Sequence, residues 1–105
     1  MKDVYQKLVR DKIPEIIAAQ GDIPTIRPLN NKEFFQALNV KLQEEVAEYL
    51  NGFSTEELAD IVEVIYAILA CKEISPDAFE QIRQKKYEER GGFQQKTYLL
   101  DVRRK

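Results

Sequence analysis

The feature that most constrains the fold is the segment Leu58 to Cys71, in which Asp60 and Glu63 are the only charged residues. A helix that is apolar around nearly its whole circumference is normally buried on most of its sides. A chain of 105 residues forms one domain of ordinary size and has few other residues with which to cover such a helix. The segment therefore predicts an all-α fold built around it, and a homodimer or higher homo-oligomer that covers the rest of its surface.

Capping residues and helix breakers divide the remainder of the chain into elements. Asn31 and Ser54 can cap the second and third helices, and Glu57 stands where it would complete a capping box with Ser54. The short connection between these two helices predicts an antiparallel hairpin. Residues 25–29 and 96–102 are expected to pair as a short two-stranded β ribbon. The expected helices are 11–20, 31–50, 54–72 and 75–90, in a four-helix antiparallel bundle that makes residues 1–105 a single domain.

The composition excludes several kinds of chemistry. The chain has no histidine and one cysteine, which rules out Ser-His-Asp and Cys-His catalysis, zinc sites of imidazole or thiolate, and an internal disulfide. Its four glycines form neither a Walker loop nor a dinucleotide fingerprint. A net charge of −2 argues against nucleic-acid binding, and no apolar run approaches the length of a membrane span. With no signal-peptide pattern at its start, the chain is expected to be cytoplasmic.

Two pairs of acidic residues stand at the facing ends of the expected hairpin. Glu45 and Glu48 are three residues apart in the second helix, and so are Glu57 and Asp60 in the third, so each pair projects from one face. Ionised carboxylates near a core shift their pKa, find a partner or bind a cation. Oxygen ligands suit Mg²⁺ or Mn²⁺, which makes these four residues candidate metal ligands. The alternative interpretation is a solvated acidic face.

Position around the second helix distinguishes its glutamates. At about 100° per residue, Glu45 lies roughly 60° from the apolar stripe, and Glu48 lies further round on the same flank. Glu44 falls almost opposite the stripe. Glu45 is therefore expected nearest the core, and Glu44 is the better candidate for solvent. The stripe itself consists of Phe35, Leu38, Leu42, Val46 and Tyr49.

Three parts of the chain resemble one known family. The pattern E-E-x-x-E followed by E-x-x-D across a helix hairpin resembles the all-α nucleoside triphosphate pyrophosphohydrolases, which include the MazG-like proteins. Residues 7–14, KLVRDKIP, are similar to the opening of small phosphoribosyl-ATP pyrophosphohydrolase-like proteins. Residues 86–93, KYEERGGF, are similar to their closing segment and to the K-F-x-x-R-F element of MazG-like domains. One departure is the interval between Glu48 and Glu57, which is shorter than in most MazG-like proteins.

The resemblance implies that the residues matching the four acids bind Mg²⁺, and that a nucleoside triphosphate is cleaved between its α and β phosphorus atoms. The products would be a monophosphate and pyrophosphate, and removal of noncanonical nucleotides would be the role. Glu44 is the candidate general base, with Glu48 as the alternative. Phosphoribosyl-ATP hydrolysis, and a non-catalytic helical dimer that binds nucleotide or protein, remain the rival functions. The candidate substrate-binding cations are Lys41, which could instead neutralise Glu45, together with Lys86, Arg90 and Arg10.

Overall fold

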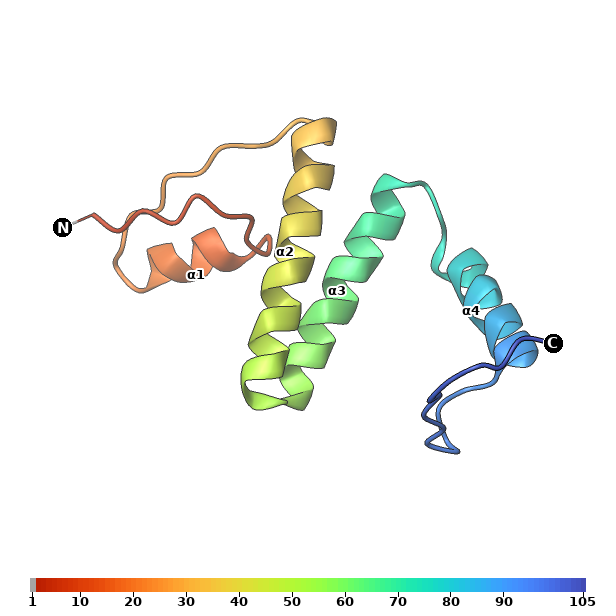
Figure 1. Cartoon of the computed structure of the whole chain (residues 1–105). Helices are drawn as coiled ribbons and strands as arrows, with labels where there is room; N and C mark the ends of the chain where they lie inside the picture. Colours follow the sequence, from red (N-terminus) through yellow and green to blue (C-terminus); the bar gives the residue numbers. More distant parts are fainter. Residues whose placement is uncertain (1) are drawn as a thin grey trace. The chain divides into compact units, whose positions relative to one another are not determined.

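The computed structural model describes residues 2–105, and all of its regular structure is helical (Figure 1). The prediction of an all-α chain with four helices is confirmed. The helices are α1 (Ile13–Ala19), α2 (Asn31–Gly52), α3 (Thr55–Cys71) and α4 (Pro76–Arg90). They belong to two compact units, the first ending at Ile74 and the second covering Ser75–Lys105. None of the helices in the described residues combines the length and apolar character that a bilayer crossing requires.

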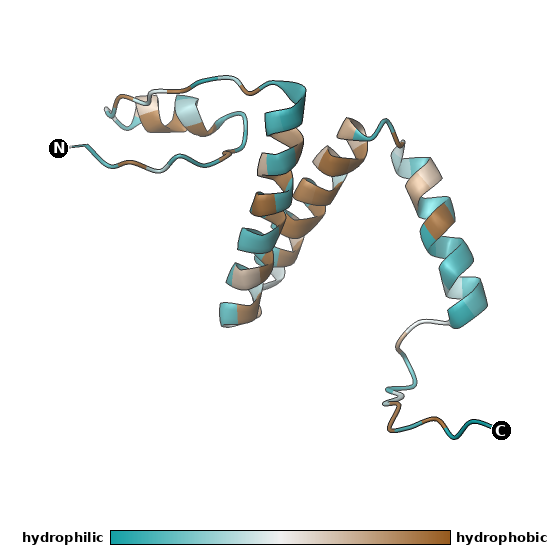
Figure 2. Cartoon of the chain, turned by 45° about the horizontal axis from the view of Figure 1, so that its top comes forward, coloured by the Kyte–Doolittle hydropathy of each residue, from teal (hydrophilic) through white to brown (hydrophobic). Residues whose placement is uncertain are grey.

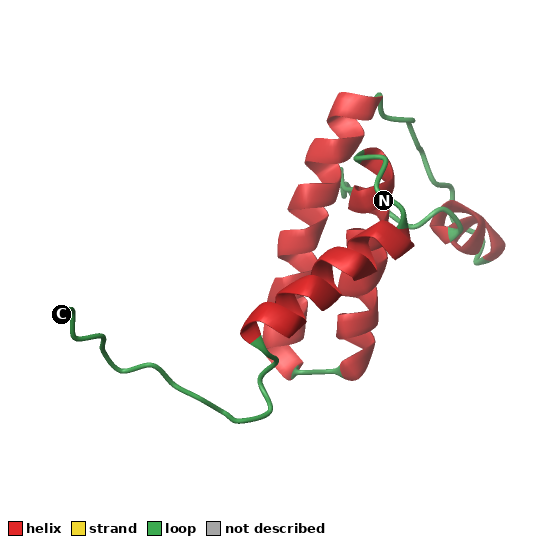
Figure 3. Ribbon diagram, turned by 90° about the vertical axis from the view of Figure 1, so that its right-hand side faces the viewer, coloured by secondary structure: helices red, strands yellow, loops and turns green. Residues whose placement is uncertain are grey.

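The expected hairpin is present, since α2 and α3 run antiparallel and pack along each other (Figures 1 and 3). Phe53 ends α2 in the left-handed conformation, with φ of 58°, and its N–H donates to the carbonyl of Tyr49 at 2.6 Å. The Phe53 ring meets the Tyr49 ring edge-on at 5.8 Å between centroids. Ser54 then opens α3 by accepting a hydrogen bond from the N–H of Glu56. A connection of two residues therefore fixes the register of the hairpin.

The core of the first unit lies between these two helices, where apolar residues of α2 and α3 face each other (Figure 2). Leu38, Val64 and Leu69 are buried, each at 8% exposure or less. The outer side of α3 is apolar and uncovered, with Leu58, Val62 and Tyr66 between 42% and 50% exposed. One face of α3 is thus packed against α2, and another is available to a partner.

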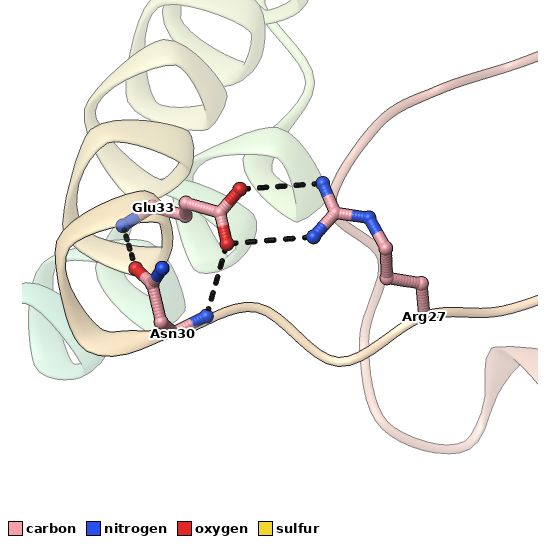
Figure 4. A network of polar contacts seen from close by, with 3 residues as sticks. All are labelled: Arg27, Asn30 and Glu33. Carbon is pink, nitrogen blue, oxygen red and sulfur yellow. Dashed lines mark hydrogen bonds and ion pairs between the residues drawn. The ribbon is translucent and has the colours of Figure 1, made fainter.

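The helix caps differ in detail from the sequence prediction. The cap of α2 is Asn30 rather than Asn31: its side chain accepts from the N–H of Glu33, whose carboxylate accepts from the N–H of Asn30. Arg27 lies beside the same carboxylate at 3.4 Å (Figure 4). The bond from the Asn30 N–H, followed by Arg27, lowers the pKa of Glu33. At α3 the capping box with Glu57 is wrong, because Ser54 bonds to Glu56 instead.

Two further predictions are corrected. The β ribbon is wrong for the described residues, which contain no strand: residues 25–29 and 96–102 lack regular structure (Figure 3). Pro24 precedes the first of these segments and Pro28 lies within it, and proline cannot donate to a strand ladder. Within the first unit the expected bundle is reduced to the hairpin, because α1 does not pack against α2 or α3. With seven residues and none buried, α1 is too short to bury a continuous face. Whether residues 1–105 act as a single domain stays a prediction.

Candidate functional site

The α2–α3 hairpin gathers three carboxylates from the two helices. One oxygen from each of Glu45, Glu57 and Asp60 lies within 4.8 Å of the others. We call these three residues the acidic triad. Glu45 comes from the second half of α2, whereas Glu57 and Asp60 come from the first two turns of α3. Three of the four acids that the sequence selected therefore converge at one point beside the hairpin loop.

Glu45 is the buried member of the triad, with 6% of its surface exposed. Its Oε1 lies 3.4 Å from the Nζ of Lys41, whereas its Oε2 is buried and has no hydrogen-bond partner. Burial, followed by the charges of Glu48 and Asp60, raises the pKa of Glu45 despite the opposing effect of Lys41. The expectation that Glu45 lies nearest the core is confirmed. An acceptor oxygen buried without a donor is costly, so this atom requires either a proton or a cation.

Glu48 stands at the edge of the triad rather than within it. It is exposed and is not one of the three carboxylates that meet within 4.8 Å. It is nevertheless close enough to act on both glutamates. Burial and then the charge of Glu48 raise the pKa of Glu57, and a hydrogen bond with Glu48 adds to this effect. The four acids thus form one electrostatic group, in which three carboxylates lie close together.

Arg10 enters the site from the segment that precedes α1. Its Nη2 donates to Oδ1 of Asp60 at 2.6 Å, across fifty positions of sequence. The sequence singled out Arg10 because of the opening motif, but nothing in the spacing indicated which residue it would meet. A contact this distant along the chain depends on the path of the N-terminal segment beside the hairpin, which helical periodicity does not describe.

Lys41 and Glu44 occupy the flank of α2 next to the triad. The Nζ of Lys41 lies 3.6 Å from Glu44 and 3.4 Å from Glu45, so this lysine neutralises neighbouring acids, as its position on the helix suggested. The side chain of Glu44 is 39% exposed. Glu44 is therefore more accessible than Glu45, and it lies outside the triad.

Lys86 and Arg90 belong to the second unit, where they line an open pocket of about 690 Å³ at the end of α4. Arg83 lines it as well, but its guanidinium is bound to Glu80, which leaves Lys86 and Arg90 as the cations of this pocket without an ion pair in the described residues. Gly92 lets the chain pass close to Tyr87 here, because a Cβ at this position would lie 2.9 Å from the Tyr87 ring and force it to shift. The pocket offers positive charge and aromatic surface together.

Comparison with known proteins gives one informative match. A 53-residue stretch is 57% identical to an uncharacterised protein of Mycolicibacterium smegmatis, which corresponds to 50% of this chain and 53% of that protein. The match thus spans about half the length of its relative. No family model and no solved structure matches the chain.

The acidic triad has the donor composition of a hard-cation site. Its donors are all carboxylate oxygens, the ligand type that Mg²⁺ and Mn²⁺ take in proteins. Lys41 offsets part of the charge on one oxygen of Glu45 and leaves the other without a partner. A divalent cation between the three carboxylates would satisfy that atom and remove the mutual repulsion of the acids. The residues present therefore fit such an ion.

Proposed function

We propose that this protein is a cytoplasmic, Mg²⁺-dependent nucleoside triphosphate pyrophosphohydrolase that releases pyrophosphate and a nucleoside monophosphate. The observation that supports it most is the buried Oε2 of Glu45, which lacks a partner beside the carboxylates of Glu57 and Asp60. Acidic residues that served only solubility would be exposed to solvent and would not be buried. The similarity of the acidic pattern to the MazG-like proteins gives the cation its role, and the family's removal of noncanonical nucleotides is the proposed biological use.

The cation would be held by Glu45, Glu57 and Asp60, with Glu48 beside them, and Mn²⁺ is the alternative ion. Bound there, Mg²⁺ would screen the negative charge of the triphosphate. Proton transfer and the positioning of the acidic groups are proposed to be carried out by side chains of the protein. Glu44 is the proposed acceptor of the proton from the attacking water, since it adjoins Glu45 and its side chain is 39% exposed. Lys41 keeps Glu44 and Glu45 in place through its two ion pairs. Glu48 is the alternative base.

Phosphate recognition is assigned to Lys86 and Arg90. Both line the pocket at the end of α4, and both lack a carboxylate partner in the described part of their unit. Positive charge that is aimed at phosphate oxygens stabilises the transition state of phosphoryl chemistry. The rings of Tyr87 and Phe93 line the same pocket and offer stacking surface for a base.

A panel of canonical and modified nucleoside triphosphates, together with phosphoribosyl-ATP, tests this function by pyrophosphate release in Mg²⁺, in Mn²⁺ and in EDTA. We expect cation-dependent release from at least one nucleoside triphosphate. Glu45→Gln should abolish it, whereas Glu56→Gln, at an exposed neighbouring acid outside the triad, should retain it. Turnover of phosphoribosyl-ATP alone would select that rival substrate. Binding of nucleotide without release of pyrophosphate from any compound would select the non-catalytic binding protein.

We also propose that a second copy of the chain covers the outer side of α3. Leu58, Val62 and Tyr66 leave apolar area there that the other described residues of the first unit do not cover, and exposed apolar patches mark association sites. Light scattering coupled to size-exclusion chromatography should give a dimer or higher oligomer, and Val62→Lys should shift it toward the monomer. A wild-type monomer at high protein concentration would contradict this part of the proposal.

A further inference from the structure

The contact between Arg10 and Asp60 places a guanidinium on one ligand of the acidic triad. The Nη2 to Oδ1 distance is 2.6 Å, and the side chains are 56% and 39% exposed. A divalent cation in the triad needs the same carboxylate, and it would repel a guanidinium held beside it. Arg10 and the cation are therefore competitors for Asp60.

The two cationic side chains at the site differ in how firmly they are held. The side chain of Lys41 is 19% exposed and is paired with two glutamates of its own helix, so it stays in place when the triad changes its occupant. Arg10 is more than half exposed and has one acidic partner. Exposed ion pairs contribute little to stability, so they exchange easily.

The backbone that carries Arg10 is fixed beside the hairpin although its side chain is exposed. Leu8 and Val9 are partly buried. Lys7 and Leu8 line a small cavity of about 220 Å³ together with Lys41 and Glu44 of α2. A guanidinium released from Asp60 would therefore remain near the triad instead of moving away with a loose terminus.

We propose that Arg10 is a displaceable counter-ion. It neutralises Asp60 while the triad holds no cation, and it turns to a phosphate oxygen of the nucleotide when a cation takes Asp60. The first half depends on cation binding alone, whereas the second half rests on the proposed function. The exchange keeps the charge of the site balanced in both states and links occupation of the triad to recognition of the substrate.

Calorimetric titration of the full chain with Mn²⁺ or Mg²⁺, without nucleotide, tests the first half. Removal of a competitor raises the apparent affinity, so Arg10→Gln should bind the ion about two- to five-fold more tightly than wild type, the range expected for an exposed ion pair. Arg27→Gln is the matched control, because Arg27 forms an exposed pair with Glu33 outside the triad. It should leave ion affinity unchanged. Equal or weaker ion binding by Arg10→Gln, with its helical circular dichroism intact, would overturn the counter-ion role.

Binding of a non-hydrolysable nucleoside triphosphate at saturating Mg²⁺ tests the second half. Arg10→Gln should weaken nucleotide binding about three-fold or more, the loss expected of one partly exposed charge-assisted contact. Arg10→Lys should restore part of the affinity, since it keeps the charge without the planar fork. If Arg10→Gln weakened the binding of both the cation and the nucleotide, the defect would be structural and the proposal would be overturned. If the wild type bound cation but no nucleotide, the proposed function would fail and the ion titration would still decide the competition.

Discussion

Substitution of Glu45 by glutamine should stabilise the protein without cation and make it insensitive to cation. The pKa of Glu45 is raised in the folded protein by burial and by neighbouring acids, so its charge opposes folding at neutral pH. Glutamine keeps an oxygen for Lys41, which lies 3.4 Å away. Its amide nitrogen takes the place of the unpartnered Oε2 and carries no charge. One unfavourable buried charge is therefore lost.

The size of both effects follows from this geometry. Relief of a charged acceptor that is buried without a partner contributes about 1 kcal/mol, so Glu45→Gln in EDTA should raise the Tm by about 4–8 °C for a domain near this size. For the wild type, Mg²⁺ at ten times its Kd adds about 1.4 kcal/mol by linkage, or roughly 6–11 °C. The variant should gain almost nothing. Added Mg²⁺ should therefore remove the advantage that the variant has in EDTA.

Thermal melts followed by circular dichroism, in EDTA and across a Mg²⁺ titration, measure both effects on the same samples. Glu56→Gln is the control, because it removes an exposed charge one position before Glu57 and should respond to Mg²⁺ as the wild type does. A lower Tm for Glu45→Gln in EDTA would show that the carboxylate is well accommodated as it stands. An equal Mg²⁺ response in wild type and variant would place the cation elsewhere. Either result would refute the reasoning about the orphaned oxygen.

Three further outcomes follow from the structure. In EDTA the free energy of unfolding should rise as pH is lowered from 7 toward 5, because the pKa values of Glu45 and Glu57 are raised in the folded state, which therefore binds protons more tightly than the unfolded state. Urea titrations across that pH range measure this free energy, and a profile that does not change with pH would contradict the prediction. Leu38→Ala should cost about 2–4 kcal/mol in chemical denaturation, since Leu38 is 3% exposed, whereas Val40→Ala at 55% exposure should cost far less. Lys86→Ala should lower kcat/KM at least about ten-fold in the pyrophosphate assay while leaving cation affinity unchanged, and unaltered kinetics would remove it from the substrate site.

The elements that the sequence predicted well are those that local chemistry determines. The hairpin followed from the short connection between the second and third helices, and α4 began at the predicted Ser75–Pro76 step. A prediction failed where a neighbouring residue could make the same hydrogen bond. Asn30 and Asn31 are equally able to cap a helix, and the choice falls on Asn30 because Glu33 stands three residues after it. The β ribbon needed a pairing between distant segments, and no local pattern specifies such a pairing.

At the site, helical periodicity predicted the burial of a glutamate on α2, but it did not predict the contact that Arg10 of the N-terminal segment makes. The angle of Glu45 from the apolar stripe indicated its burial, and the structure has it buried. The same argument put Glu48 further from the stripe than Glu45, and Glu48 is exposed. The contact between Arg10 and Asp60 could not be predicted from helical periodicity. Arg10 belongs to a non-helical segment whose path is set by packing, which residue spacing along one helix does not encode.

The shortness of the hairpin loop explains why the acids meet. Glu45 lies seven residues before the end of α2 at Gly52, and Asp60 lies five residues after the start of α3 at Thr55. At about 1.5 Å of rise per residue, these two positions differ by about 3 Å along paired antiparallel helices, so their side chains can reach the same point. Helical spacing of three would put each pair on one face wherever it occurred. The connection of two residues, Phe53 and Ser54, holds the end of α2 beside the start of α3, so acids near the turn on the two helices lie close together.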